Sequence, residues 1–363
     1  MARRLLRQQS EIKPLAGRSP RERAHTFVRD KYWEKHRDKI AYSSGTWYAF
    51  DGRWWQQKPE FEVQNELQAI IDNDRKLSIQ ASAATLNSIT NLLRIRCSWP
   101  DKEFDSVSDL INFQDCTLEI STRQRRAFDK KDHLTSAFPF AYDPEAKSDV
   151  WEMFLDKVIP NDCRTFLQEF AGYCLTTDTL HETSVWFLGP AGCGKSTFIE
   201  GIRAAMGDRV TTFSINNLES RFGVSHLRGK TLAISAEQPA SLRQAQILNQ
   251  LISGEGITVE RKYQNPFEMF NRAKFLWAMN EQPRVYAKES GLTRRVVIIK
   301  FAPLPESERD DTVKRQIIRS GPAIFNWMME GLDRLTARGK FERPQESASV
   351  LKLVTEADPQ VEP

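Results

Sequence analysis

The chain has 363 residues, a formal net charge of +4, 40% hydrophobic residues and 28% charged residues. This length suggests two or three domains of about 100–200 residues each, and the composition is that of an ordinary soluble protein, which excludes a fibrous or disordered chain. No apolar run approaches the roughly 20 residues that a membrane-spanning helix needs, and the basic N-terminus lacks the apolar core of a secretory signal. We therefore expect a cytoplasmic protein without a membrane partner.

The five cysteines lie far apart, with no Cys-x-x-Cys pair and no Cys/His cluster at zinc-binding spacing. We expect them to be reduced and structural. The small positive charge permits a nucleic-acid partner if Lys and Arg gather where the polyanion lies.

Residues 1–40 are rich in arginine and lysine and have little apolar periodicity, so we expect a basic N-terminal arm. A solvated tail and a DNA-contacting arm are equal alternatives for it. Residues 41–145 are expected to form a small α+β domain. Its first predicted element is a β-hairpin, because two aromatic runs within residues 46–55 flank Asp51-Gly52, a strong signal for a tight turn.

The aromatic cluster of this hairpin is more typical of a small domain's core than of a surface that stacks on nucleic-acid bases. Leucines and isoleucines at mixed helical spacing then predict helix over residues 63–96, and shorter apolar pieces separated by turn residues predict strands over 110–142. Large apolar side chains at i, i+3, i+4 and i+7 spacing predict a helical lead-in or collar within residues 146–182.

A glycine-rich loop is the most specific motif of the chain. The short apolar run 185–188 is typical of a strand buried on both faces, and it leads into a match to the pattern G-x-x-x-x-G-K-[ST]. In such a loop the backbone N–H groups surround phosphate oxygens, the lysine neutralises the β and γ phosphates, and the following hydroxyl coordinates Mg²⁺. We therefore predict that ATP and Mg²⁺ are bound by Gly189, Pro190, Ala191, Gly192, Cys193, Gly194, Lys195, Ser196 and Thr197.

The helix that such a loop must open is also predicted, because apolar residues share one helical face from Phe198 until Gly207 ends the pattern. Since strand, loop and helix agree, a chance glycine-rich turn is a poor alternative. We expect an ATPase core over residues 183–304, followed by a C-terminal helical segment and tail over residues 305–363.

Two later strands end in polar residues that suit hydrolysis. The run 231–236 leads to Glu237, a candidate general base and Mg²⁺ ligand, whose alternative role is an ordinary strand-end glutamate. The run 275–279 leads to Asn280, whose amide is a candidate to hold the attacking water or the γ-phosphate. Asparagine at a strand end is otherwise a common turn former.

Two adjacent arginines, Arg294 and Arg295, precede another apolar strand at residues 296–299. Either is a candidate arginine finger that reaches the γ-phosphate held by a neighbouring subunit. We prefer Arg295 because it lies closest to the strand, where the fold holds a side chain most firmly. Taken alone, an arginine pair is more typical of a surface salt bridge.

The order of these motifs resembles superfamily 3 helicases of the AAA+ class, and above all the phage/plasmid and poxvirus-type primase-helicases. The resemblance rests on the glycine-rich loop, on Arg294-Arg295, and on residues 235–237, 251–258 and 280–283; it covers roughly residues 43–330. It implies an α/β fold, with a P-loop AAA+ ATPase core built on a central parallel sheet. It also implies a ring, usually a hexamer, that hydrolyses ATP between subunits and moves single-stranded DNA through its pore.

Relatives often carry a primase domain before this region and a winged-helix segment after it, and we expect neither in this chain. If priming is needed, we expect a separate primase or replication initiator as a partner. A further departure is Ala236, because many relatives have a small hydroxyl residue, and more distant ones a second acid, just before the glutamate. Metal binding is then expected to rest on Ser196, water and the phosphates.

Residues 257–270 alternate in character and then reverse through a turn-rich stretch, which predicts a β-hairpin with a basic, aromatic tip. In the resembled family the matching hairpin lines the pore. The resemblance therefore implies that Lys262 contacts backbone phosphate and Tyr263 packs on a sugar or base, with Arg261 as a second candidate. Without the motif order, a surface hairpin with solvated charges is an equally good interpretation.

Two other functions stay open at this stage. A P-loop kinase would require an arginine-rich lid and a substrate pocket in place of a basic hairpin before the asparagine. A nucleotide-switched DNA-binding or scaffolding ATPase without unwinding is poorly separated from a helicase by sequence. We favour an ATP-dependent DNA helicase of mobile-element or phage replication.

Overall fold

The structure is a computed structural model that describes residues 19–74, 76–100, 104–220, 223–236, 241–242, 244–259, 267–281, 284–285 and 291–345. The chain divides into an N-terminal unit, Met1–Asp51 with Trp55–Glu103, and a C-terminal unit, Gly52–Trp54 with Phe104–Pro363. None of the described helices is both long enough and apolar enough to cross a membrane.

The N-terminal unit combines three helices with a small antiparallel sheet of strand order β1-β2-β3. Its elements are α2 (Pro20–Lys35), β1 (Ile40–Ser43), β2 (Thr46–Phe50), β3 (Trp55–Lys58), α3 (Glu60–Asn73) and α4 (Ala83–Arg96). The predicted hairpin is confirmed, because Phe50 lies opposite Trp55 in the β2–β3 register. Trp47 and Trp55 are buried, so the aromatic cluster belongs to the core of this unit.

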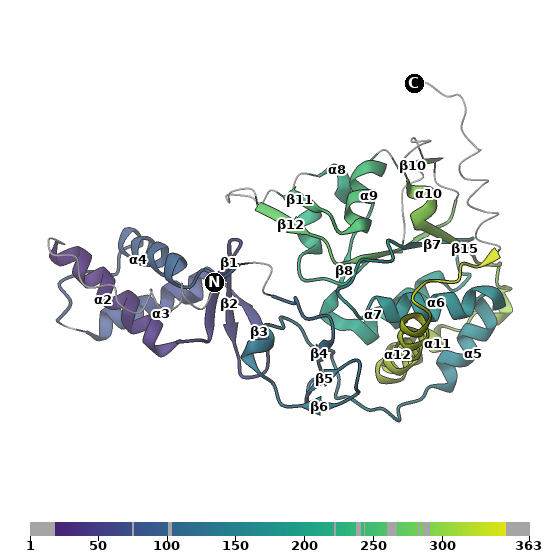
Figure 1. Ribbon diagram of the computed structural model, residues 1–363, viewed down its shortest axis with the longest axis horizontal. Helices are drawn as coiled ribbons and strands as arrows, with labels where there is room; N and C mark the ends of the chain where they lie inside the picture. The colour runs from purple at the N-terminus through teal and green to yellow at the C-terminus, as the bar shows by residue number, and fades with distance from the viewer. Residues whose placement is uncertain are drawn as a thin grey trace, which may run out of the picture. The chain divides into compact units, whose positions relative to one another are not determined.

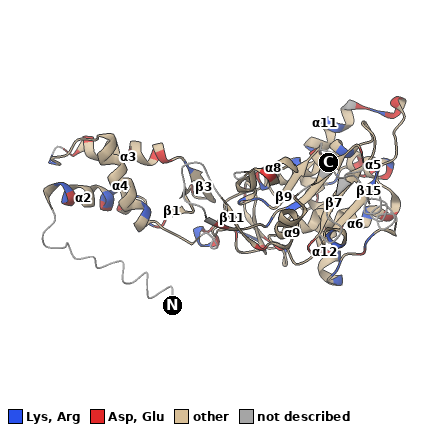
Figure 2. Cartoon of the chain, turned by 90° about the horizontal axis from the view of Figure 1, so that it is seen from above, with Lys and Arg blue, Asp and Glu red and all other residues tan. Residues whose placement is uncertain are grey.

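Helix α2 lies within the stretch predicted to be a basic arm, and it packs against α3 and α4. Ser19 caps its N-terminus and forms a capping box with Glu22. Only a narrow stripe of the helix is buried, formed by His25, Val28 and Tyr32, which explains why its periodicity is weak in the sequence. Figure 2 shows basic and acidic residues interspersed along α2.

In the described residues, the C-terminal unit holds three further sheets, one hairpin and most of the helices. Its strands are β4 (Leu110–Asn112), β5 (Thr117–Glu119), β6 (Arg125–Arg126), β7 (Ser184–Leu188), β8 (Val210–Thr212), β9 (Leu232–Ser235), β10 (Ser241–Leu242), β11 (Gly256–Val259), β12 (Phe267–Phe270), β13 (Lys274–Met279), β14 (Arg284–Val285) and β15 (Val296–Lys300). Its helices are α5 (Asp149–Val158), α6 (Asn161–Tyr173), α7 (Lys195–Met206), α8 (Asn216–Glu219), α9 (Ala245–Ser253), α10 (Leu292–Arg295), α11 (Asp311–Arg319) and α12 (Gly321–Arg338).

The sequence places the end of the small domain at residue 145, whereas the division of the chain falls at residue 103. The reason is packing, because Ile111, Phe113 and Leu118 share one buried cluster with Phe325 of α12. The rings of Phe113 and Phe325 meet edge to face with their centroids 4.9 Å apart. Strands β4 to β6 therefore belong with the larger unit.

A five-stranded parallel sheet of order β15-β7-β13-β9-β8 forms the centre of this unit. The fold is therefore mixed α/β with a small N-terminal domain. Figure 1 shows α5, α6, α7, α11 and α12 on one side of the sheet, and α8 and α9 on the other. Strand β13 lies between β7 and β9, although β9 precedes it in the chain.

Each face of the sheet buries its own hydrophobic cluster, because side chains of a strand alternate between faces. On β7, Val185 and Phe187 join the cluster under α7 and α12, whereas Trp186 joins the cluster under α9. On β13, Leu276 and Trp277 divide in the same way. Burial on both faces explains the continuous apolar runs in the sequence.

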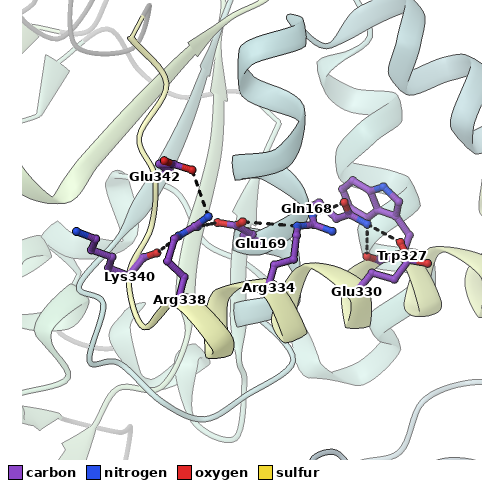
Figure 3. A network of polar contacts seen from close by, with 8 residues as sticks. All are labelled: Gln168, Glu169, Trp327, Glu330, Arg334, Arg338, Lys340 and Glu342. Atoms are coloured by element: carbon purple, nitrogen blue, oxygen red, sulfur yellow. Dashed lines mark hydrogen bonds and ion pairs between the residues drawn. The ribbon is translucent and has the colours of Figure 1, made fainter.

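Helices α6 and α12 pack very closely, because a Cβ at Gly331 would lie 2.0 Å from the carbonyl oxygen of Gln168. A polar network closes this interface (Figure 3). Glu169 is fully buried and forms ion pairs with Arg334 and Arg338 of α12. The amide of Gln168 donates to the carbonyl oxygen of Trp327 at 2.8 Å.

The predicted hairpin after α9 is confirmed in its arms, since β11 and β12 pair antiparallel with Val259 opposite Phe267. Its tip, which holds Arg261, Lys262 and Tyr263, lies outside the described residues. The five cysteines are buried and free of disulfide bonds.

Candidate functional site

The glycine-rich loop connects the end of β7 to the start of α7, as the sequence predicts. Gly192 and Gly194 have φ angles of 77° and 99°, in the left-handed region that glycine enters without steric cost. No side chain caps the N-terminus of α7. Its first backbone N–H groups and the positive end of its dipole therefore suit an anion.

Lys195 is buried at the first position of α7. Its Nζ donates to the carbonyl oxygens of Gly189 and Pro190, at 2.5 and 2.8 Å. It also lies 3.2 Å from Asn280 Oδ1 and 3.5 Å from Cys193 Sγ. The ammonium is thus held by acceptors of the loop itself and by the end of β13.

The sheet register brings Asn280 to the loop. Met279 lies opposite Leu188 in the parallel β13–β7 pair, and the N–H of Gly189 donates to the Met279 carbonyl oxygen at 3.3 Å. The next residue on each strand therefore starts at the same edge of the sheet. This explains how Lys195 and Asn280, which are 85 residues apart, come into contact.

The end of β9 reaches the same edge through Ala236, while Glu237 lies outside the described residues. Strand β9 is not the direct neighbour of β7, because β13 is inserted between them. The amide of Asn280, at the end of β13, consequently lies next to the loop. The end of β9 lies on the far side of β13 from the loop.

A cavity of about 580 Å³ opens beside the loop. Residues 191–197, Ala236 and Asn280 form one wall, so seven of the nine predicted loop residues line it. Helix α5 and the segment 304–316 form the other walls, with Val150, Met153 and Val313 as apolar lining. This size and mixed lining are typical of a small-molecule site, which usually measures about 300–1,000 Å³.

Ser196 is exposed and lines this cavity. Within the described ranges, no group of three or more His, Cys, Asp or Glu side chains gathers in a way that could hold a metal ion. Among the described residues of the cavity, the Ser196 hydroxyl is a candidate ligand for a divalent cation. Mg²⁺ is commonly bound in this way, through one or two protein ligands plus substrate phosphates.

The two predicted finger arginines lie away from the cavity. Val296 pairs with Ser184, so Arg294 and Arg295 precede the starting edge of the sheet, whereas the glycine-rich loop follows its finishing edge. A five-residue strand separates the two edges, about 16 Å at the usual rise per residue. Neither arginine is among the residues that line the cavity.

The two arginines also differ in environment. The Arg295 side chain is 10% exposed and its guanidinium lies 2.6 Å from Glu182. The Arg294 side chain is 71% exposed and 3.9 Å from the same carboxylate. Arg295 is thus fixed by an ion pair, while Arg294 projects into solvent.

Sequence reasoning missed the walls of the cavity outside the loop. Arg309, which precedes α11, and Lys314, which lies within it, both line the cavity. Met153 of α5 also lines it, although 70% of that residue is exposed. An apolar residue outside the buried stripe of a predicted helix, such as Met153, is a signal that the sequence does contain. Whether that residue lines a cavity depends on which element packs opposite the helix.

Comparisons with known proteins agree with this fold. Residues 26–160 match the family described as "D5 N terminal like", and residues 187–295 match a family of unknown function, DUF5906. The apo structure of the NrS-1 C terminal region (305-718) is similar with a TM-score of 0.59 and 12% identity, covering 93% of this chain and 76% of that one.

Two further solved structures are similar. The A form apo structure of the NrS-1 C terminal region gives a TM-score of 0.57 at 12% identity, covering 90% of this chain and 74% of that one. The A form of the 305-718 fragment gives 0.57 at 11% identity, with coverages of 93% and 76%. The chain shares the fold of the NrS-1 C-terminal region.

Proposed function

We propose that the chain is a P-loop ATPase of the AAA+ class and the motor subunit of a DNA helicase. The observation that carries the proposal is the contact between Lys195 and Asn280, 3.2 Å apart, at the wall of a 580 Å³ cavity that residues 191–197 line. A buried cation, an uncapped helix N-terminus and a strand-end amide suit a nucleoside triphosphate.

Each group then has a role in hydrolysis. Lys195 neutralises the β and γ phosphates, and Asn280 orients the attacking water or the γ-phosphate. Glu237, which follows β9, accepts the proton of that water as general base. When bound, Mg²⁺ neutralises charge on the β and γ phosphates, with Ser196 as its side-chain ligand and Glu237 as a further candidate.

The DNA-binding part of the proposal rests on the hairpin formed by β11 and β12 and on the family resemblance. Its tip residues Arg261, Lys262 and Tyr263 would contact the phosphates and bases of single-stranded DNA within the pore of a ring. The match of residues 26–160 to the "D5 N terminal like" family supports a role in phage-type replication.

Hydrolysis would be completed by an arginine from a neighbouring subunit. Because Arg294 and Arg295 lie at the edge of the sheet opposite the glycine-rich loop, neither is positioned for the nucleotide of its own chain. The geometry reverses the preference drawn from the sequence: Arg295 is committed to Glu182, and the exposed Arg294 is better placed to reach outward.

The test is the ATPase rate of the full chain with and without single-stranded DNA, with Mg²⁺ present. A helicase motor should hydrolyse ATP several-fold faster with DNA and should separate a forked duplex. Hydrolysis that ignores DNA would contradict the helicase part, and a scaffold would respond weakly without unwinding. A kinase would consume ATP only with a small-molecule acceptor.

Glu237→Gln provides the second test. The amide keeps the shape of the side chain but cannot accept a proton, so the variant should bind ATP and hydrolyse it very slowly. Nucleotide titration and steady-state turnover measure the two properties separately. Unchanged turnover would move the general base to another residue.

A further inference from the structure

Arg309 lies against the glycine-rich loop although it belongs to the segment that leads into α11. A Cβ added at Gly192 would lie 2.7 Å from Arg309 Cζ and 3.0 Å from Nε and Nη1. The guanidinium is therefore in contact with the turn of the loop, and Arg309 lines the same cavity as Lys195.

The charged neighbours of Arg309 have partners of their own. Lys157 donates to the carbonyl oxygen of Glu308 at 2.8 Å and pairs with its carboxylate at 3.1 Å. Asp310 accepts the N–H of Thr312 at 2.7 Å and so caps α11. Neither acid is hydrogen-bonded to Arg309 in the part of the chain that the structure describes.

The Arg309 side chain makes one hydrogen bond among the described residues, from Nη2 to the carbonyl oxygen of Leu304 at 3.3 Å. A guanidinium has five N–H donors, so most of them have no partner among the residues that the structure describes. Arginine recognises phosphate oxygens through paired, charge-assisted hydrogen bonds. A cation with free donors at this position suits the phosphate chain of a nucleotide.

The position of the Arg309 guanidinium in the cavity favours contact with the phosphates of a nucleotide over contact with its base. The apolar lining of Val150, Met153 and Val313 suits a nucleobase, whereas Gly192 belongs to the turn whose backbone N–H groups suit phosphates. The Arg309 guanidinium lies beside Gly192, at the place that suits phosphates.

We propose that Arg309 is a further nucleotide-binding residue, which contacts the phosphate chain from within the same subunit. The inference rests on the proposed ATP site. It assigns to the segment before α11 a direct part in binding, in addition to the loop, Asn280 and the arginine from a neighbouring subunit.

The experiment is isothermal titration of the full chain with ATP and with ADP, both with Mg²⁺. Arg309→Ala should weaken ATP binding about tenfold or more, as expected for a lost charge-assisted hydrogen bond, and should weaken ADP binding less. Arg309→Lys should bind ATP more tightly than Arg309→Ala, because it restores the charge. The matched control is Arg319→Ala, an exposed arginine near the end of α11 that does not line the cavity.

Thermal unfolding without nucleotide separates binding from folding. The proposal requires that Arg309→Ala unfolds at the wild-type temperature. Wild-type ATP affinity in this variant would overturn the inference, as would a loss of affinity that follows a lowered unfolding temperature and is not improved by lysine. If the folded wild-type chain itself shows no saturable ATP binding, the proposed ATP site fails instead.

Discussion

At the scale of single residues, the contacts of Lys195 indicate how the glycine-rich loop is held. A buried ammonium needs acceptors, and here the carbonyl oxygens of Gly189 and Pro190 and the Asn280 amide supply them. Phosphate oxygens are stronger acceptors for the same cation. Phosphate oxygens bound in the cavity would therefore compete with the loop carbonyls for Lys195.

Lys195→Ala is expected to abolish ATP hydrolysis and weaken ATP binding, because the loop loses its only side-chain cation. Steady-state ATPase assays and nucleotide titration measure the two effects. Lys147→Ala, which removes an exposed lysine that does not line the cavity, should leave both unchanged. Near-normal turnover in Lys195→Ala would overturn the assignment of the site.

A second lysine, Lys274, lies at the start of β13 and far from solvent. Its Nζ donates to the Thr176 carbonyl oxygen at 2.7 Å and lies 4.4 Å from the centre of the Tyr173 ring. Burial lowers the pKa of Lys274 to about 7, although Cys174 and Asp178 act in the opposite direction. An unfolded lysine has a pKa of about 10.4.

The stability of the protein should therefore depend on pH through Lys274. Between about pH 7 and pH 10 the unfolded chain binds a proton that the native chain does not, so the free energy of unfolding rises with pH by up to about 1.4 kcal/mol per unit. Below pH 7 Lys274 is protonated in both states, so it no longer makes the free energy of unfolding depend on pH. Lys274→Met should flatten the rise between pH 7 and pH 9 in denaturant titrations.

Lys300→Met is the matched control, because Lys300 ends a strand of the same sheet but is exposed. It should keep the wild-type dependence on pH. An identical dependence in Lys274→Met and wild type would mean that Lys274 is protonated in the native protein throughout this range.

At the scale of elements, local signals predicted much of the fold. The hairpin of β2 and β3 follows from aromatic runs around Asp51-Gly52, and the succession of β7, loop and α7 follows from an apolar run, glycines and one helical face. These features depend on neighbours in sequence, so their signals are complete within a short window. The sequence did not predict helix α2, because only three of its residues are buried and its apolar periodicity is weak.

What the sequence could not predict depends on contacts between distant segments. The insertion of β13 between β7 and β9, the Glu182–Arg295 ion pair and the position of Arg309 on Gly192 all join residues far apart in the chain. Motif order still identified Lys195 and Asn280 as candidates, because both follow apolar strands whose ends meet in a parallel sheet.

The interface of α6 and α12 provides a prediction about stability. Glu169 is fully buried and its oxygens face Arg338 and Arg334, so removal of Arg338 leaves a buried carboxylate with one distant partner at 3.7 Å (Figure 3). Arg338→Ala should lower the free energy of unfolding by about 2–4 kcal/mol, since breaking a buried ion pair leaves an uncompensated charge. Denaturant titration measures the change.

Glu342→Ala is the control, because Glu342 pairs with the same arginine at 3.3 Å but is 81% exposed. An exposed ion pair contributes about 0–1 kcal/mol, so this variant should unfold like the wild type. Equal stability of Arg338→Ala and wild type would mean that Arg334 alone satisfies Glu169.

At the scale of the whole molecule, the position of the arginine pair bears on assembly. The cavity beside the glycine-rich loop lies at the edge where the sheet strands end, and Arg294 lies at the edge where β15 begins. If Arg294 acts on a γ-phosphate, that phosphate belongs to another copy of the chain. A monomer would then bind ATP with a complete loop and hydrolyse it slowly, and activity would rise with protein concentration.

Mixing two inactive variants tests this arrangement directly. Arg294→Ala should bind ATP almost normally, while hydrolysis falls by about 10³-fold or more, as for other arginine fingers. Mixed with Lys195→Ala under conditions of subunit exchange, it should regain ATPase activity, because some interfaces then pair an intact loop with an intact arginine. Recovery only in the parallel mixture with Arg295→Ala would identify Arg295 as the finger. No recovery in either mixture, despite mixed assemblies demonstrated by mass, would mean that neither arginine acts on the nucleotide of a neighbouring subunit.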